Sequence, residues 1–129
     1  MKKTNIQNLN IYTQAFDISN QIWKIVIKWD WFVKDTLGKQ LVRAVDSVAL
    51  NISEGYGRFH YLENRKFCFY ARGSLQETLT CIEMAFNRNL ITEDVYSPLV
   101  DNLNLLGKKL NSYISSINTK FSEAGNLPT

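Results

Sequence analysis

Residues that form tight turns are scarce in this chain. Its 129 residues include 6 Gly and 2 Pro, about half of the usual combined share of roughly 12%. A sandwich or barrel of many short strands needs a turn every few residues. The scarcity therefore argues against such folds and favours long helices.

Cysteine and histidine are scarce as well. With 2 Cys the chain cannot be a disulfide-rich secreted scaffold. Its 1 His excludes a di-iron bundle, which needs two Glu-x-x-His motifs, and no Cys/His set has the spacing of a zinc site. No nucleophile has a base oriented beside it, and no phosphate-binding loop of the GxxxxGK type is present. We therefore predict no catalytic residues, no metal and no cofactor.

Long apolar runs are absent too. No stretch approaches the 18 apolar residues that a transmembrane helix needs, and the first residues, MKKTNIQNLNIY, lack the apolar segment of a signal peptide. We expect a cytoplasmic protein with no membrane partner. Hydrophobic residues make up 45% and charged residues 21%, which is ordinary for a globular chain. The net charge of +3 permits an acidic partner but does not require one.

Apolar residues recur at alternating steps of three and four along four segments, which is the pattern of amphipathic helices. The segments run over about 11–31, 34–56, 61–89 and from about 92 onward. Short connections between four such helices predict an all-α protein, an antiparallel up-down four-helix bundle. We expect a single domain over 1–129, with an ordered core over about 8–121 and a flexible tail over 122–129.

Glycines and aromatic residues mark particular points of these helices. Gly55 and Gly57 are expected to end the second helix in the left-handed conformation, and Gly73 to allow a close helix contact, since an interior Gly costs roughly 1 kcal/mol relative to Ala. At the end of the first segment, three aromatic residues have two interpretations. They plug the mouth of the bundle or, if exposed beside Lys28 and Lys34, they stack on bases; the residues are Trp29, Trp31 and Phe32.

A polar stripe lies beside the apolar stripe of the second helix. At about 100° per residue it occupies roughly 80° of arc. It is either a solvated flank or a hydrogen-bonded network at the edge of the core, and short Ser and Asn side chains favour the network. Its members are Gln40, Arg43, Ser47, Asn51, Glu54 and Arg58.

The third helix supplies partners for this stripe. If the turn is centred near residues 59 and 60, the two helices run antiparallel, and residues at the same height along them have numbers that sum to about 119. We predict a structural polar seam of Gln40, Arg43, Ser47, Asn51, Glu54 and Glu77. Charge-assisted pairs between such residues would fix the register of the two helices. The residues expected side by side are Arg43 with Glu77, Glu54 with Arg65, and Arg72 with Ser47 and Asp46.

The arginines of the chain all fall between residues 43 and 88, on the second and third helices. Arginine is the cation best suited to phosphate, although the local basic bias is mild. Cations left over after the seam is paired are the candidates for binding RNA or DNA. These are Lys39, Arg58, Lys66, Arg72 and Arg88, with Arg58 the best of them because it lies at an exposed helix end.

The motif residues of the second and third helices resemble a known family. The segments read QLVRAVDSVALNISEGYGR and YARGSLQE. They are similar to Q-x-x-R-A-x-x-S-[IV]-x-x-N-I-A-E-G-x-G-R followed by A-x-G-S-x-x-E, the pattern of the bacterial 23S rRNA-intervening-sequence proteins, sometimes misnamed ribosomal proteins. Ser53 departs from this pattern. So does Phe59-His60-Tyr61, which stands where a helix-capping Ser is usual.

This resemblance implies a four-helix bundle that assembles as a homopentamer and has no known enzymatic activity. Some members are encoded within insertions in ribosomal RNA genes, and a related accessory protein binds nucleic acid and a reverse transcriptase. The implied function is that of a non-enzymatic nucleic-acid or ribonucleoprotein accessory factor with no small-molecule substrate. The alternative is a protein–protein assembly module that binds no nucleic acid.

Overall fold

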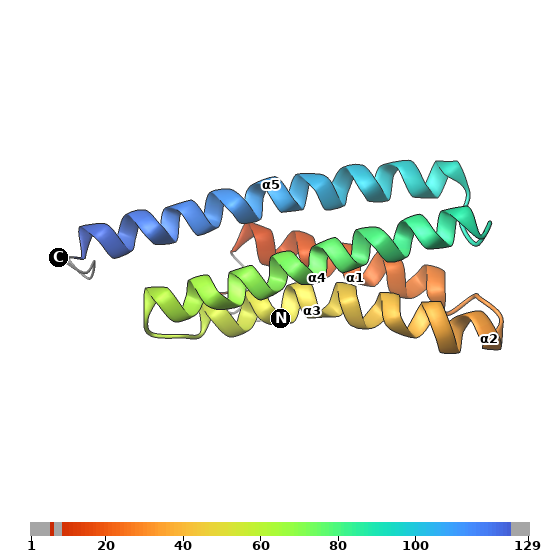
Figure 1. The fold of residues 1–129 in the computed structure, drawn as a ribbon, viewed down its shortest axis with the longest axis horizontal. Coiled ribbons are helices and arrows are strands. Elements are labelled where there is room, and N and C mark those ends of the chain that lie inside the picture. The colour runs from red at the N-terminus through yellow and green to blue at the C-terminus, as the bar shows by residue number, and fades with distance from the viewer. Residues whose placement is uncertain (1–5, 7–8, 125–129) are drawn as a thin grey trace, which may run out of the picture.

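The computed structural model of the chain describes residue 6 and residues 9–124. Within these residues four long helices pack as an antiparallel up-down bundle, in which α3 contacts α1 and α4, and α5 contacts α4 and α1 (Figure 1). The predicted all-α four-helix bundle is confirmed. The elements in chain order are α1 (Asn10–Val26), α2 (Trp31–Val33), the π-helical turn η2 (Lys34–Gly38), α3 (Lys39–Tyr56), α4 (Tyr61–Asn87) and α5 (Glu93–Glu123).

The first helix ends earlier than predicted, at Val26 instead of near residue 31. The chain then turns, and Asp30 caps the next helix by accepting a hydrogen bond from the Val33 amide at 3.2 Å. A carboxylate at this position satisfies an otherwise unpaired amide of the first helical turn. The second helix of the bundle therefore begins at Trp31 and continues through η2 into α3.

Gly38 lets this helix approach the end of α1. A Cβ added at Gly38 would lie 2.8 Å from Cγ1 of Val26, closer than carbon atoms pack. Of the three aromatic residues around the turn, Trp29 packs against the core, but Trp31 is 74% and Phe32 68% exposed. The prediction that all three plug the mouth of the bundle is therefore wrong for Trp31 and Phe32.

One contiguous apolar cluster fills the bundle, and all four long helices contribute to it. On α5 the buried positions follow one another at steps of three or four, the spacing of one helix face. Its fully buried large residues include Ile22, Leu41, Ile52, Ile82, Leu103, Leu106 and Leu110.

Helix α5 is continuous through Pro98 and begins after Thr92, whose side chain makes no capping hydrogen bond. It extends to Glu123, so the predicted tail is wrong for Ser122 and Glu123, which are helical. The periodic burial continues through Phe121 and carries the helix past the predicted end. Residues 125–129 of that tail lie outside the described residues.

The glycines differ from the predictions in an informative way. Gly57 follows α3 with a right-handed φ of −76°, and Gly55 lies within the helix, so neither uses the left-handed conformation. Among the described non-glycine residues that conformation occurs at Asn89, with a φ of 61°, between α4 and α5. Gly73 was expected to allow a close helix contact, but apart from its own turn of α4 no atom lies within 4 Å of a Cβ placed there.

Candidate functional site

Three short polar side chains form a hydrogen-bonded seam between α3 and α4. Asn51 Nδ2 donates to the backbone oxygen of Ser47 at 2.8 Å and to Ser47 Oγ at 2.9 Å. Ser74 Oγ, from α4, donates to Ser47 Oγ at 3.0 Å. Ser47 beside Ser74 and Gly55 beside Asn64 fit the predicted register closely. The structure therefore brings two of the predicted seam residues together and adds Ser74.

The longer members of the predicted seam remain outside it. Gln40, Arg43 and Glu77 are exposed, and none of them makes an ion pair or hydrogen bond within the described part of the chain. The predicted pair of Arg43 with Glu77 is therefore not formed, although the register places the two residues nearly level. An exposed ion pair gains only about 0–1 kcal/mol and must order two long side chains. Ser and Asn have short side chains, so between two helices they reach only their near neighbours.

Arg58 is held at the α3–α4 turn by two carboxylates. Its guanidinium lies 2.5 Å from Glu54 and 3.5 Å from Glu63. It also lies over the ring of Phe67, 5.0 Å from the centroid. Two predictions fail here: Glu54 pairs with Arg58 and not with Arg65, and Arg58 is not left unpaired.

Two other arginines join α4 to α5. Arg65 donates to Asn118 Oδ1 at 2.9 Å, and Arg72 donates to Asn111 Oδ1 at 3.2 Å. The prediction that Arg72 lies near Ser47 and Asp46 is wrong. Because each residue turns the helix by about 100°, Arg72 faces α5 while Ser74, two positions on, faces α3. Asp46 instead accepts a hydrogen bond from Ser19 of α1.

Cations and exposed aromatic rings alternate on the first half of α4. Lys66 Nζ lies 5.9 Å from the ring centroid of Phe67 and 6.0 Å from that of Tyr70. The Arg72 guanidinium lies 4.9 Å from the centroid of Phe69. Phe69 is 41% and Tyr70 50% exposed. We call Lys66, Phe69, Tyr70 and Arg72 the basic–aromatic face.

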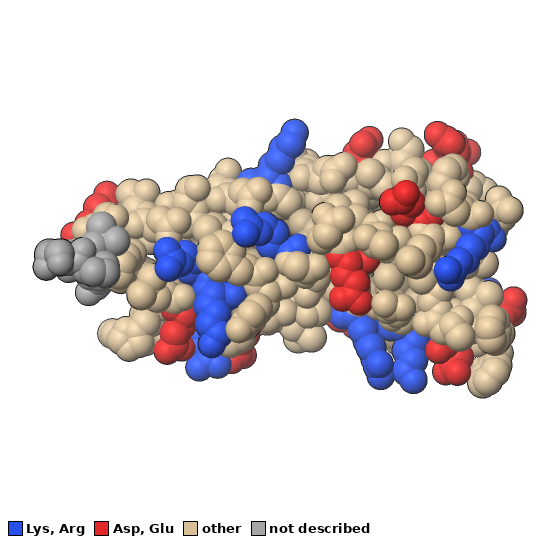
Figure 2. Space-filling model, in the orientation of Figure 1, with Lys and Arg blue, Asp and Glu red and all other residues tan. Residues whose placement is uncertain are grey.

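The remaining predicted nucleic-acid residues lie elsewhere. Arg88 follows the last residue of α4, about 24 Å from Arg72 by helical rise, and Lys39 begins α3. Blue side chains gather over the first half of α4 and the adjoining part of α5, whereas more of the red ones lie toward the α4–α5 connection (Figure 2). Lys66 and Arg72 thus both lie on the first half of α4, whereas Arg88 and Lys39 lie away from them.

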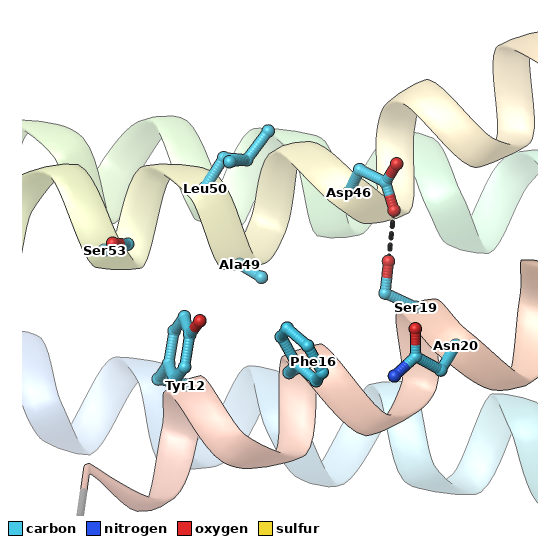
Figure 3. Close-up of a pocket in the computed structure, with 8 residues that line it drawn as sticks. All are labelled: Tyr12, Phe16, Ser19, Asn20, Asp46, Ala49, Leu50 and Ser53. Atoms are coloured by element: carbon cyan, nitrogen blue, oxygen red, sulfur yellow. Dashed lines mark hydrogen bonds between the residues drawn. The ribbon is translucent and has the colours of Figure 1, made fainter. Parts of the chain in front are cut away.

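A second surface, between α1 and α3, was missed by the sequence reasoning. Phe16 and Leu50 line a hollow of about 250 Å³, with the Ser19–Asp46 hydrogen bond at one end (Figure 3). Along the same side of α1, Trp23 is 53% and Ile27 46% exposed. Phe16, Trp23 and Ile27 are spaced seven and four residues apart, a helical spacing that could have revealed this second apolar stripe. We call Phe16, Trp23, Ile27 and Leu50 the α1–α3 face.

The ionisable groups with shifted pKa values lie away from both faces. Burial raises the pKa of the Cys68 thiol to about 11 and also raises the pKa of Cys81. Burial likewise raises the pKa of Tyr113, whose hydroxyl accepts a hydrogen bond from Asn64 Nδ2 at 3.2 Å. Among the described residues, no group of His, Cys, Asp and Glu could hold a metal ion. No helix in the same part of the chain is long and apolar enough to cross a membrane.

Fold and surface together define an all-α up-down bundle that presents a basic–aromatic face on α4 and an apolar face between α1 and α3. The sequence model of the 23S rRNA-intervening sequence protein family matches residues 7–112, and the chain belongs to that family.

A solved structure shows the same fold. It is the 1.70 Å crystal structure of a protein with unknown function from the S23 ribosomal protein family of Bacteroides thetaiotaomicron VPI-5482. The two chains are 18% identical and superpose with a TM-score of 0.73, over 81% of this chain and 97% of the other. No curated protein matches this chain.

Proposed function

We propose that the protein is a non-enzymatic, homo-oligomeric accessory factor of the bacterial cytoplasm that binds nucleic acid through its basic–aromatic face. The observation that carries this proposal is the alternation of Lys66 and Arg72 with the exposed rings of Phe69 and Tyr70. Proteins that bind single strands combine cations that follow the phosphates with aromatic rings on which bases stack.

The charges on this face are available to an anionic partner. Lys66 makes no ion pair within the described residues, and Arg72 is hydrogen-bonded to the neutral amide of Asn111. Neither positive charge is therefore cancelled by a carboxylate, in contrast to that of Arg58. Trp31 and Phe32 are also highly exposed but have no cation over their rings, so we prefer the α4 site to the base-stacking alternative at the end of α1.

A charge-reversal experiment tests the proposal. Binding of a structured RNA is measured by filter binding at two salt concentrations for the wild type and for the double variant Lys66→Glu/Arg72→Glu. The matched control, Lys39→Glu/Arg88→Glu, changes the net charge by the same amount at the two predicted residues that lie elsewhere. Thermal unfolding checks that each variant folds.

We expect the Lys66/Arg72 variant to bind at least about tenfold more weakly and its log–log salt slope to become shallower by about two, one for each lost phosphate contact. The control should bind within about threefold of the wild type, since it loses only long-range attraction. Equal losses in both variants would show that net charge alone drives binding. A wild type that binds no RNA at low salt would refute the proposed function.

The α1–α3 face favours the second candidate, a self-assembling module that binds no nucleic acid. Leu50 is 67%, Trp23 53% and Phe16 49% exposed, and exposed apolar surface of this kind marks protein contacts. Assembly as a homopentamer, through a heterologous contact repeated around a ring, is part of both candidates. A ring would also repeat the basic–aromatic face and raise the avidity for a long polyanion.

Light scattering at micromolar concentration tests the assembly. We expect the wild type to have the mass of a pentamer and Leu50→Glu to reduce it toward the monomer mass, because a carboxylate in an apolar contact loses its hydration. Leu105→Glu on α5 is the control, since Leu105 is also exposed, to 47%, but lies outside the α1–α3 face. A monomeric wild type would exclude assembly through this face.

A further inference from the structure

A third hollow lies at the α3–α4 turn, beside the end of α5. It has a volume of about 630 Å³ and is lined by Phe59, His60, Tyr61, Leu62 and Phe121. Phe59 is 92% exposed, and its ring meets that of His60 edge-on, with 5.1 Å between centroids. An exposed ring above an aromatic hollow leaves one flat apolar surface free to stack.

The hollow brings together the α3–α4 turn and the C-terminal part of α5. The family match ends at residue 112, whereas α5 continues to Glu123. Phe121 belongs to this continuation, and Arg65 of α4 holds the same part of α5 through Asn118 at 2.9 Å. Of the lining residues, Phe121 lies beyond the matched residues, and the other four belong to the turn and the start of α4 within them.

The charges around the hollow favour an anion. Arg58 is balanced by Glu54 and Glu63. The other cations here, Arg65 and Lys66 on α4 and Lys120 on α5, make no ion pair within the described residues, and Glu123 is the single carboxylate on the last turn of α5. Together with Arg58 and its two carboxylates, these groups comprise four cations and three carboxylates, a net charge of +1, and such a positive charge suits a phosphate.

The hollow is continuous with the basic–aromatic face. Leu62, Lys66, Phe69 and Gly73 are spaced four, three and four residues apart, so they form one outward stripe of α4, about 16 Å long by helical rise. No atom lies within 4 Å of a Cβ placed at Gly73, so the stripe is open at that end. A strand bound at Lys66 and Arg72 would therefore lead directly to Phe59.

We propose that this hollow receives an unpaired base of RNA or DNA, which stacks on Phe59 while the adjoining phosphates contact Lys66 and its neighbours. This inference rests on the proposed function and adds a substrate class to it: single-stranded or looped nucleic acid. A base within a duplex is stacked on both faces and must be extruded before it reaches a protein ring, so duplexes gain nothing from Phe59.

The test uses the full chain, a single-stranded RNA of about 12 nucleotides, a length within the usual range of single-strand sites, and the same strand paired to its complement. Fluorescence anisotropy at low salt gives the affinity for each. We expect Phe59→Ala to weaken single-strand binding about tenfold, the order of one lost stacking contact, and to leave duplex binding within about twofold. Phe59→Tyr, which keeps a flat ring, should restore the single-strand affinity.

Phe32→Ala is the matched control, because Phe32 is also highly exposed, at 68%, but lies in α2, between α1 and α3 and at the opposite end of α3. It should bind both RNAs like the wild type. The inference is overturned if Phe59→Ala weakens the binding of both RNAs equally or of neither, or if Phe32→Ala has the same effect as Phe59→Ala. It is also overturned if Phe59→Ala changes the mass measured by light scattering, because that result would assign the hollow to a protein contact. Failure of the wild type to bind either RNA would instead refute the proposed function itself.

Discussion

Gly55 and Gly73 lie on the two helices that carry the family motif, and their surroundings are opposite. A Cβ at Gly55 would lie 2.7 Å from Asn64 Oδ1 and 3.0 Å from Cβ of Phe67, whereas a Cβ at Gly73 would meet nothing within 4 Å. The inner seam between α3 and α4 thus accounts for Gly55, Ser47 and Ser74 by packing and hydrogen bonding. The outward face of α4 has no such explanation within one chain, and this is the face for which we propose a partner.

Gly55→Ala should show the largest effect on stability. The added methyl group overlaps Asn64 and Phe67 of α4, and overpacking of this kind costs up to about 3 kcal/mol. Urea denaturation measures the change. Gly57→Ala is the control, because the nearest atoms to its Cβ lie at 3.7 Å. Equal stability of the two variants would contradict the tight contact at Gly55.

The buried thiol of Cys68 should make the interior sensitive to high pH. Burial raises its pKa from 9.0 to about 11, so the folded state holds this proton more tightly than the unfolded chain. This group therefore leaves the free energy of unfolding unaffected below pH 9 and lowers it between about pH 9 and pH 11, by up to about 2.7 kcal/mol in total. Denaturation at several pH values should show a smaller alkaline loss in Cys68→Ala than in the wild type, because Cys81 and Tyr113, whose pKa values burial also raises, remain in both proteins. An identical alkaline loss in both proteins would assign it to other groups.

Gly73→Ala should have a smaller effect of opposite sign. With open space around the new methyl group, the gain in helix propensity stabilises the chain by about 1 kcal/mol. The measurement is urea denaturation at a concentration where the protein is monomeric. Destabilisation there would reveal an unrecognised contact and remove the contrast with Gly55. A decrease in oligomer mass for the same variant would place Gly73 in the contact between subunits.

The sequence was sufficient for the helices, the bundle and the register of α3 against α4. Apolar residues at steps of three and four define one face of each helix, and the short turn after Gly57 forces antiparallel pairing. Periodicity also placed Ser47 and Asn51 at the edge of the core, where the structure finds them hydrogen-bonded to each other and Ser47 also bonded to Ser74. These features follow from local spacing alone, so they could be derived without coordinates.

The tertiary structure decided which neighbour each flanking residue meets. Arg72 and Ser74 are two positions, or about 200°, apart on α4, and the rotation of α4 within the bundle points one at α5 and the other at α3. The exposure of Phe59 and Leu50 likewise depends on how far each helix extends and how the four are rotated about their axes. A sequence fixes the angle between residues on one helix, but the rotation of each helix within the bundle is set by the packing of all four.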